Sequence, residues 1–166
     1  MRRPLLPIVF AVALAACGTD DPTVERGPEP SATSSRQPPS VVSIRTESGQ
    51  AATLQVEVAD DDAERARGLM GVEELPADQG MAFVWDEPVD TSFWMKDTSI
   101  PLSIAFWDTD GRVIAILDMQ PCEADPCPTY GPGEPFIGAV EANLGWFEDH
   151  GVAVGDRLEL EERAYV

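Results

Sequence analysis

Lys96 and Asp97 are adjacent residues whose side chains could do chemistry, and they lie inside an apolar segment. Lys96 is the only lysine of the chain, whose other permanent cations are arginines. A lysine removed from water can act as a base or a nucleophile, and a Lys–Asp pair can hold an anionic or polyhydroxylated ligand. A surface lysine that pairs only with Asp97 explains the pattern equally well. The sequence therefore gives a candidate site and leaves its role, catalytic or binding, open.

Three tryptophans lie on neighbouring predicted strands, at Trp85, Trp94 and Trp107, and Tyr130 follows in a later loop. A tryptophan that faces outward in a cleft can stack on a sugar ring or another aromatic group. Core packing is the alternative, and we expect it for at least two of the three. The candidate ligand-binding residues are thus Trp94, Lys96, Asp97, Trp107 and Tyr130.

Cys122 and Cys127 form a close pair of cysteines in a loop rich in proline. In an oxidising compartment such a pair is normally a disulfide, and closing so small a loop stabilises the fold by about 2 kcal/mol. A metal site needs more ligands, and the one histidine, His150, lies near the end of a predicted polar helix. We therefore predict a disulfide and no metal.

Four methionines, Met70, Met81, Met95 and Met119, could be read as a copper(I) site, because soft thioethers select that ion. Each lies among apolar residues, so methionine that fills gaps in a core is the better explanation. The sequence contains no glycine-rich phosphate loop, nucleophile elbow or paired-histidine zinc motif. We expect no cofactor, and no catalytic residue can be assigned.

Residues 1–17 have the pattern of a lipoprotein signal peptide. Arg2 and Arg3 precede an apolar run at 5–14 that is too short for a membrane span, and two alanines stand directly before Cys17. An ordinary secretory signal with an incidental cysteine is the alternative. Lipidation of Cys17 would supply two or three acyl chains, enough for stable anchoring. We expect an extracytoplasmic protein that is anchored to the membrane.

Residues 18–40 are rich in proline, serine and threonine and poor in large apolar side chains. Such a segment cannot bury enough apolar surface to offset its ordering entropy, so we predict a disordered tether. Residues 41–166 have the length of one ordinary domain with a core of its own.

The chain is strongly acidic, with a formal net charge of −19. This charge opposes binding to nucleic acid and to anionic lipid head groups, because phosphate would be repelled. A small neutral ligand, a glycan or a basic envelope protein remains compatible with it. Solubility or adaptation to salt explains the acidic surface without any partner, and we expect a monomer.

Short alternating segments with close turns predict a mostly β domain. Asp60-Asp61-Asp62 lacks the spacing of a calcium loop and is better explained as a helix N-cap. The elements expected are strands at 41–47, 53–58, 80–85, 91–95, 102–107, 112–119, 136–142 and 155–162 and short helices at 63–67 and 144–150. The pattern is typical of an α+β fold in which a small antiparallel sheet curls into a barrel-like domain with one or two short helices.

Several motifs in this order resemble the domain of unknown function 192 family of small bacterial and archaeal proteins. The resemblance covers about residues 53–160, and the motifs that carry it are Gly68-Leu69-Met70, Gly80-Met81-Ala82-Phe83, Phe93-Trp94-Met95-Lys96-Asp97-Thr98, Ile100-Pro101-Leu102, Asp110-Gly111, Pro121-Cys122, Tyr130, Val140-Glu141-Ala142, Gly145 and Gly155-Asp156. It implies a small barrel-like fold and no agreed activity. The family pattern often has asparagine at Asp97 and usually aspartate at Ser103, and we interpret both departures as structural.

These observations favour a lipid-anchored, non-catalytic domain that binds a ligand or an envelope partner, such as a glycan. The 93–107 segment and the 128–136 loop would form the binding surface. Two alternatives stay open. The first is an enzyme that uses Lys96 and Asp97 as an acid–base or nucleophilic pair, and the second is a structural or assembly protein without a pocket.

Overall fold

The computed structural model describes residues 39–161, so the predicted signal peptide and almost all of the tether lie outside the described residues. Within them no helix is long and apolar enough to cross a membrane. The elements are β1 (Ser40–Arg45), β2 (Ala51–Ala59), α1 (Asp62–Arg67), β3 (Gln79–Val89), β4 (Phe93–Trp94), β5 (Leu102–Trp107), β6 (Val113–Met119), β7 (Thr129–Tyr130), β8 (Phe136–Asn143), α2 (Trp146–Asp149) and β9 (Arg157–Glu161).

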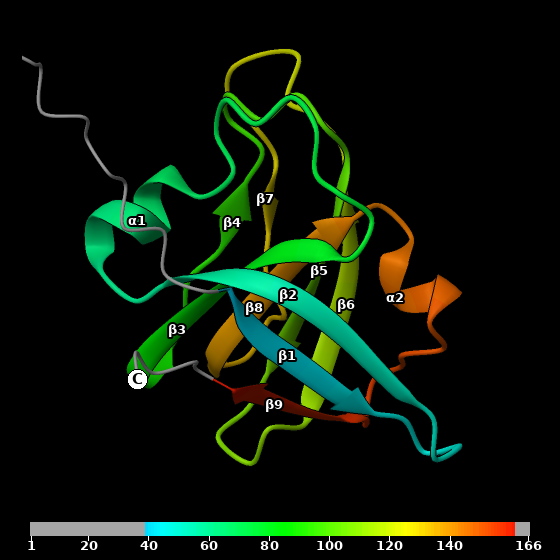
Figure 1. The fold of residues 1–166 in the computed structure, drawn as a ribbon. Helices are drawn as coiled ribbons and strands as arrows, with labels where there is room; N and C mark the ends of the chain where they lie inside the picture. The colour runs from blue at the N-terminus through cyan, green and yellow to red at the C-terminus, as the bar shows by residue number, and fades with distance from the viewer. Residues whose placement is uncertain (1–38, 162–166) are drawn as a thin grey trace, which may run out of the picture. The chain divides into compact units, whose positions relative to one another are not determined.

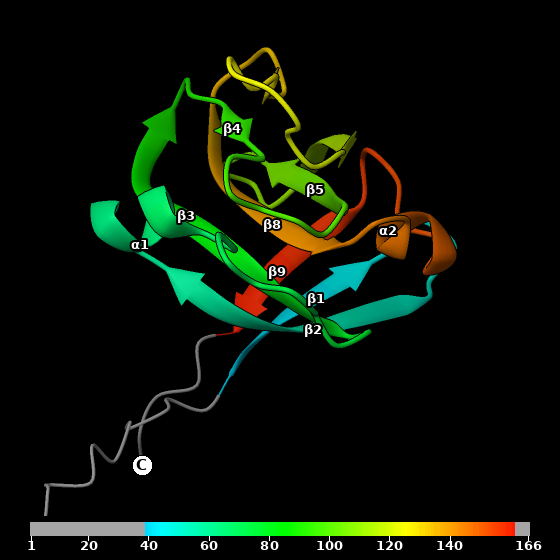
Figure 2. The same ribbon diagram turned by 90° about the horizontal axis from the view of Figure 1, so that it is seen from above.

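Seven of these strands form one sheet in the order β6-β5-β8-β3-β2-β1-β9. The sheet curls strongly, as Figures 1 and 2 show, and a bridge between Arg112 and Arg157 joins the start of β6 to the start of β9. β4 and β7 form a separate two-stranded ribbon. The predicted mostly β, barrel-like fold class is confirmed. The pairing is antiparallel except between β2 and β3, which run parallel because α1 connects them.

Helix α1 begins as the acidic run predicts. The Asp61 side chain accepts a hydrogen bond of 2.8 Å from the backbone N–H of Glu64, which satisfies an N–H that has no partner within the helix. The helix ends at Gly68, whose φ of 48° lies in the left-handed region that favours glycine. The N-cap interpretation of this acidic run is therefore confirmed.

The core divides into two clusters because successive strand side chains point to opposite faces. On β5, Leu102, Ile104 and Phe106 belong to one cluster, whereas Ala105 and Trp107 belong to the other. We call the first the ribbon-side core, because Phe93 of β4 and Tyr130 of β7 pack against it. The second, the inner core, also receives α2 through the buried Trp146 and Phe147.

Candidate functional site

The β4–β7 ribbon brings together the two segments that the sequence proposes as a binding surface. Phe93 pairs with Tyr130 and Trp94 pairs with Thr129. The structure joins Cys122 to Cys127 in a disulfide, as predicted, with the Cα atoms 5.5 Å apart. This link closes the loop immediately before β7, and it therefore restrains the strand that lies beside Trp94.

Alternation along β4 decides which side chain faces out. Phe93 points inward, with its ring centroid 5.0 Å from that of Phe83 and 5.6 Å from that of Phe106, both in edge-to-face geometry. Met95 is buried in the ribbon-side core. Trp94 lies between these two anchors and keeps 48% of its surface exposed. Its ring is thus held outward by a backbone that is fixed on both sides.

Lys96 and Asp97 lie on the tight turn that follows β4. The N–H of Thr98 donates to the carbonyl of Met95 at 3.3 Å, and the N–H of Gly71 donates to the carbonyl of Asp97 at 2.9 Å. Asp97 has a φ of 53°, a conformation that aspartate and asparagine adopt more readily than most residues. The Lys96 Nζ lies 5.3 Å from the centroid of the Trp94 ring, in a cation–π arrangement.

The arrangement gives no support to a catalytic Lys–Asp pair. Lys96 and Asp97 are both exposed, and the ion pairs found among the described residues do not include one between them. A lysine that serves as base or nucleophile is normally removed from water. The turn instead presents a cation, a carboxylate and an indole ring to solvent, and we call Trp94, Lys96 and Asp97 the ribbon surface.

The other aromatic candidates are not on this surface. Trp107 keeps only 6% of its surface exposed and belongs to the inner core, where its ring packs against the backbone of Gly138. Tyr130 is half-buried against the ribbon-side core. Trp85 is also half-buried, with the Arg65 guanidinium 5.2 Å from its ring centroid. Of the tryptophans at 85, 94, 107 and 146, only Trp94 faces outward.

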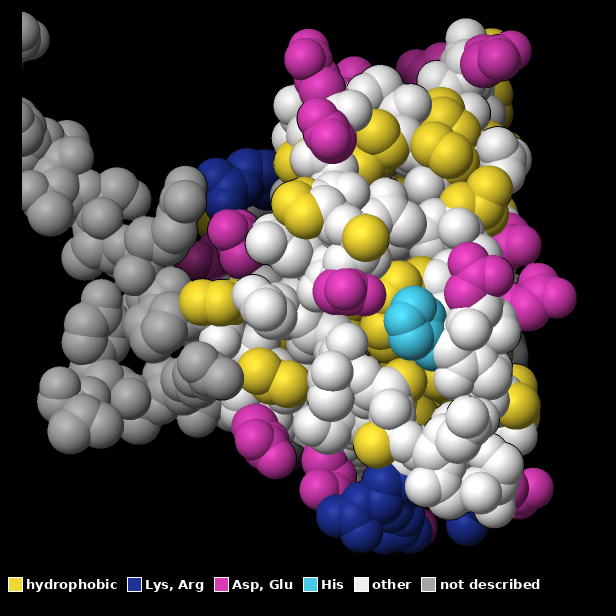
Figure 3. All heavy atoms as spheres, turned by 45° about the vertical axis from the view of Figure 1, so that its right-hand side comes forward, with side chains coloured by type: hydrophobic (Ala, Val, Ile, Leu, Met, Phe, Trp, Pro, Cys, Tyr) yellow, Lys and Arg dark blue, Asp and Glu magenta, His cyan; other side chains and the backbone are white. Residues whose placement is uncertain are grey.

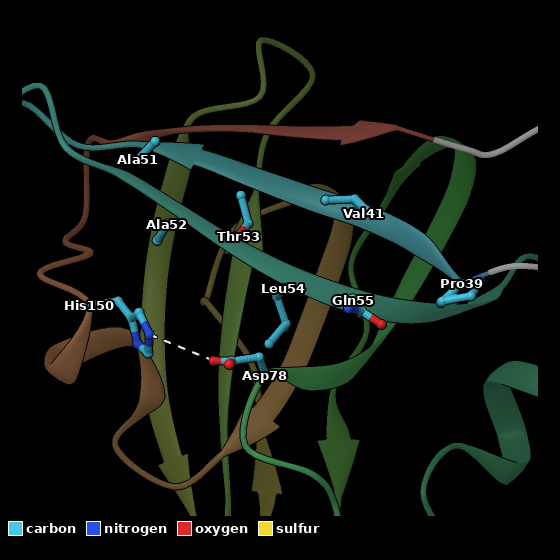
Figure 4. A pocket seen from close by; sticks show the side chains of 9 residues that line it. All are labelled: Pro39, Val41, Ala51, Ala52, Thr53, Leu54, Gln55, Asp78 and His150. Carbon is cyan, nitrogen blue, oxygen red and sulfur yellow. Dashed lines mark ion pairs between the residues drawn. The ribbon is translucent and has the colours of Figure 1, made fainter.

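A hollow of about 560 Å³ lies away from the ribbon, beside β2 and the end of α2. Figure 3 shows its histidine, the cyan side chain, next to an acidic one, and Figure 4 shows His150 and Asp78 pointing toward one another at one end. The His150 ring stacks on Trp146 at 4.1 Å. Sequence reasoning missed this hollow because Asp78 and His150 are far apart in the chain and neither belongs to a motif.

A second hollow, of about 480 Å³, is lined by Ser103 and Asp118. Ser103 is buried, donates a hydrogen bond to the Asp118 carboxylate and accepts one of 2.9 Å from the Gly145 N–H. A structural role for Ser103 is consistent with these contacts, because the hydroxyl links two strands to the segment before α2.

Glu141 is a buried acid that belongs to one of the motifs behind the family resemblance, and no role was predicted for it. It lies on β8 between Met81 of β3 and Ile104 of β5, with 5% of its surface exposed. Burial raises its pKa to about 8, because the charged form loses its hydration. Apolar neighbours therefore keep this carboxyl protonated at neutral pH.

Metal ligands do not gather anywhere within residues 39–161, where no group of three or more His, Cys, Asp or Glu side chains could hold an ion. Met81, Met95 and Met119 are buried in the ribbon-side core among aliphatic and aromatic side chains. Their positions match methionine used to fill a core.

Comparison with known proteins agrees with this fold. Residues 43–160 match the family described as DUF192, uncharacterized ACR. The crystal structure of a proposed transcription regulator from Sinorhizobium meliloti 1021 is similar to this fold, with a TM-score of 0.67. The two sequences are 34% identical, and the match covers 73% of this chain and 92% of the other. A protein of unknown function from Novosphingobium aromaticivorans DSM 12444 is 32% identical, with a TM-score of 0.64, over 72% of this chain and 83% of the other. The comparison with curated proteins finds no match.

Proposed function

Since the chain belongs to the DUF192 family, whose description assigns no activity, we propose its function from its own surface: it is a non-catalytic, extracytoplasmic lipoprotein that binds a neutral, polyhydroxylated ligand such as a glycan. The ribbon surface of Trp94, Lys96 and Asp97 is the binding site. The observation that carries this proposal is the 48% exposure of Trp94 between two buried neighbours.

The chemistry of the ribbon surface suits a sugar. The apolar face of a pyranose ring stacks on an indole, and its hydroxyl groups can donate to the Asp97 carboxylate and accept from the Lys96 ammonium. The ribbon is anchored by Phe93 and by the Cys122–Cys127 disulfide, so little ordering entropy is lost on binding. A rigid, exposed aromatic ring with one donor and one acceptor beside it is a reasonable lectin-like surface.

The proposed location, outside the cytoplasm and anchored to the membrane, rests on the sequence before residue 39. The positive residues, the short apolar run and the alanines before Cys17 support lipidation at that cysteine. A disulfide between the two remaining cysteines is consistent with an oxidising compartment outside the cytoplasm.

Nucleic acid is not the partner that we propose. The similar Sinorhizobium meliloti protein is described as a proposed transcription regulator. This chain has a formal net charge of −19, which opposes contact with a phosphate backbone. The charge of the ribbon surface is nearly balanced, with one cation and one anion, and this favours a neutral ligand.

A glycan array followed by calorimetry on the best ligand tests the site. We expect Trp94→Ala to weaken binding at least about fivefold, because an aromatic contact contributes about 1 kcal/mol beyond the area that it buries. Lys96→Met keeps the aliphatic stem and removes the charge, and it should also weaken binding. The matched control is Val154→Ala, which shortens another exposed apolar side chain and should leave binding unchanged.

Two results would contradict the proposal. Binding that is equally strong in folded Trp94→Ala would move the site elsewhere. A glycan array without any ligand for the parent protein would favour the structural or assembly role.

A further inference from the structure

We propose that the hollow between β2 and α2 is a second binding site, which takes a small aliphatic amine. The site is independent of the ribbon surface. Its recognition group is the pair formed by Asp78 and His150, whose side chains point toward one another (Figure 4). The ammonium end of the ligand would lie between them.

The hydrogen bonds of His150 determine which of its ring nitrogens carries the proton. The Nδ1 atom lies 2.7 Å from the carbonyl oxygen of Trp146, and a carbonyl can only accept. Nδ1 therefore carries the hydrogen in the neutral ring, and Nε2 is left as an acceptor. Stacking on Trp146, at 4.1 Å and an interplanar angle of 22°, fixes the orientation of the ring.

Asp78 presents a second acceptor to the same point. Its Oδ1 lies 3.8 Å from the His150 Nε2, too far for a direct hydrogen bond. The indole Nε1 of Trp146 donates to this Oδ1 at 3.3 Å and holds the carboxylate in place. Two acceptors thus converge without a donor between them among the described side chains. A group with several N–H donors and a positive charge satisfies both.

The rest of the hollow selects an aliphatic amine over other cations. Asp78 is the only lining residue with a fixed charge, so the hollow is negative at neutral pH. The half-buried Val41 and the exposed Pro39 are lining residues that offer apolar surface to a methylene chain, and the Gln55 side chain offers a further acceptor farther along β2. A volume of about 560 Å³ suits a small ligand.

Calorimetry with putrescine tests this site on the full-length protein in a nonionic detergent, at about pH 8. We expect saturable binding that Asp78→Asn weakens about tenfold or more, because the amide keeps the shape and removes the charge. His150→Phe keeps the stacked ring, removes the Nε2 acceptor and should also weaken binding. Glu87→Gln removes one exposed charge elsewhere and is the matched control.

These measurements distinguish specific binding of putrescine in the hollow from nonspecific electrostatic attraction to an acidic surface. Equal effects of Asp78→Asn and Glu87→Gln would overturn the proposal, as would the absence of saturable putrescine binding. Equally tight binding of butanediol, the uncharged analogue, would also overturn it. Trp94→Ala should leave putrescine binding unchanged and Asp78→Asn should leave glycan binding unchanged, so each site can fail without the other. Thermal unfolding of each variant establishes that it is folded.

Discussion

Ser103 on β5 and Asp118 on β6 face each other in register, and the Ser103 hydroxyl donates a hydrogen bond to the Asp118 carboxylate. The same hydroxyl oxygen accepts the N–H of Gly145 at 2.9 Å. The family pattern that this chain resembles usually has a carboxylate at position 103. In this chain Asp118 on the neighbouring strand supplies a carboxylate, and the Ser103 hydroxyl occupies the buried position.

Ser103→Asp should therefore destabilise the domain, because two facing carboxylates repel and the Asp118 carboxylate loses its donor. We expect a loss of about 1–3 kcal/mol in the free energy of unfolding. The double variant Ser103→Asp, Asp118→Ser restores one hydroxyl and one carboxylate and should recover most of this loss. Guanidinium unfolding of the single and double variants measures the coupling. A double variant no more stable than Ser103→Asp would contradict the proposed coupling between positions 103 and 118.

Glu141 should make stability fall as pH rises. Its pKa is about 8 in the folded chain, against 4.5 as its ordinary value, so the folded state holds a proton that the unfolded state has lost between these values. The contribution is fully present below the ordinary value and is lost progressively as pH rises to about 8. The slope is at most about 1.4 kcal/mol per pH unit.

Glu141→Gln is the test of this pH dependence. The amide has nearly the same shape and does not titrate, so the variant should lack the contribution of Glu141 between about pH 5 and pH 8. Other carboxyl groups titrate in acid, so the quantity to compare is the difference in unfolding free energy between parent and variant at each pH. A difference that does not change with pH would show that Glu141 is ionised, or accessible to water, in the folded protein.

The sequence predicted the fold better than the site, for identifiable reasons. Two largely apolar runs on either side of a tight turn at Asp110-Gly111 located β5 and β6, and the acidic run before α1 located its N-cap, because these signals are local. β7 was not predicted, since Thr129–Tyr130 is only two residues long and pairs with a strand far earlier in the chain. The parallel pairing of β2 with β3 likewise depends on tertiary context.

The outward direction of Trp94 follows from anchors that no local pattern shows. Alternation predicts that the side chains of Trp94 and Phe93 point to opposite faces of the strand. Which of the two is buried depends on Phe83 and Phe106 of other strands. Trp107 has the same residue type and is buried because Gly138 leaves room for its ring. The Asp78–His150 pair could not be predicted, because only the curl of the sheet and α2 bring these residues together.

Cys17→Ser tests the proposed lipid anchor. Without the thiol, no diacylglyceryl group can be attached, and the protein should be released from membranes or remain unprocessed. Fractionation without detergent, followed by immunoblotting, measures the change. The control is Cys122→Ser with Cys127→Ser, which keeps the proposed lipidation site and should stay with the membrane. Full membrane retention of Cys17→Ser would exclude lipid anchoring at this residue.

Removal of the disulfide should lower ligand affinity at the ribbon surface and leave ligand affinity at the Asp78–His150 site unchanged. The bond closes a small loop directly before β7, so Cys122→Ser with Cys127→Ser should lower the free energy of unfolding by about 2 kcal/mol. β7 pairs only two residues with β4, and a looser β7 should let the Trp94 backbone move and reduce glycan affinity. Putrescine affinity should not change, because Asp78 and His150 lie on other elements.

Mass spectrometry of the parent without reductant should find Cys122 joined to Cys127, and alkylation of both thiols there would contradict the bond. Equal losses at both sites in the double variant would instead indicate general destabilisation.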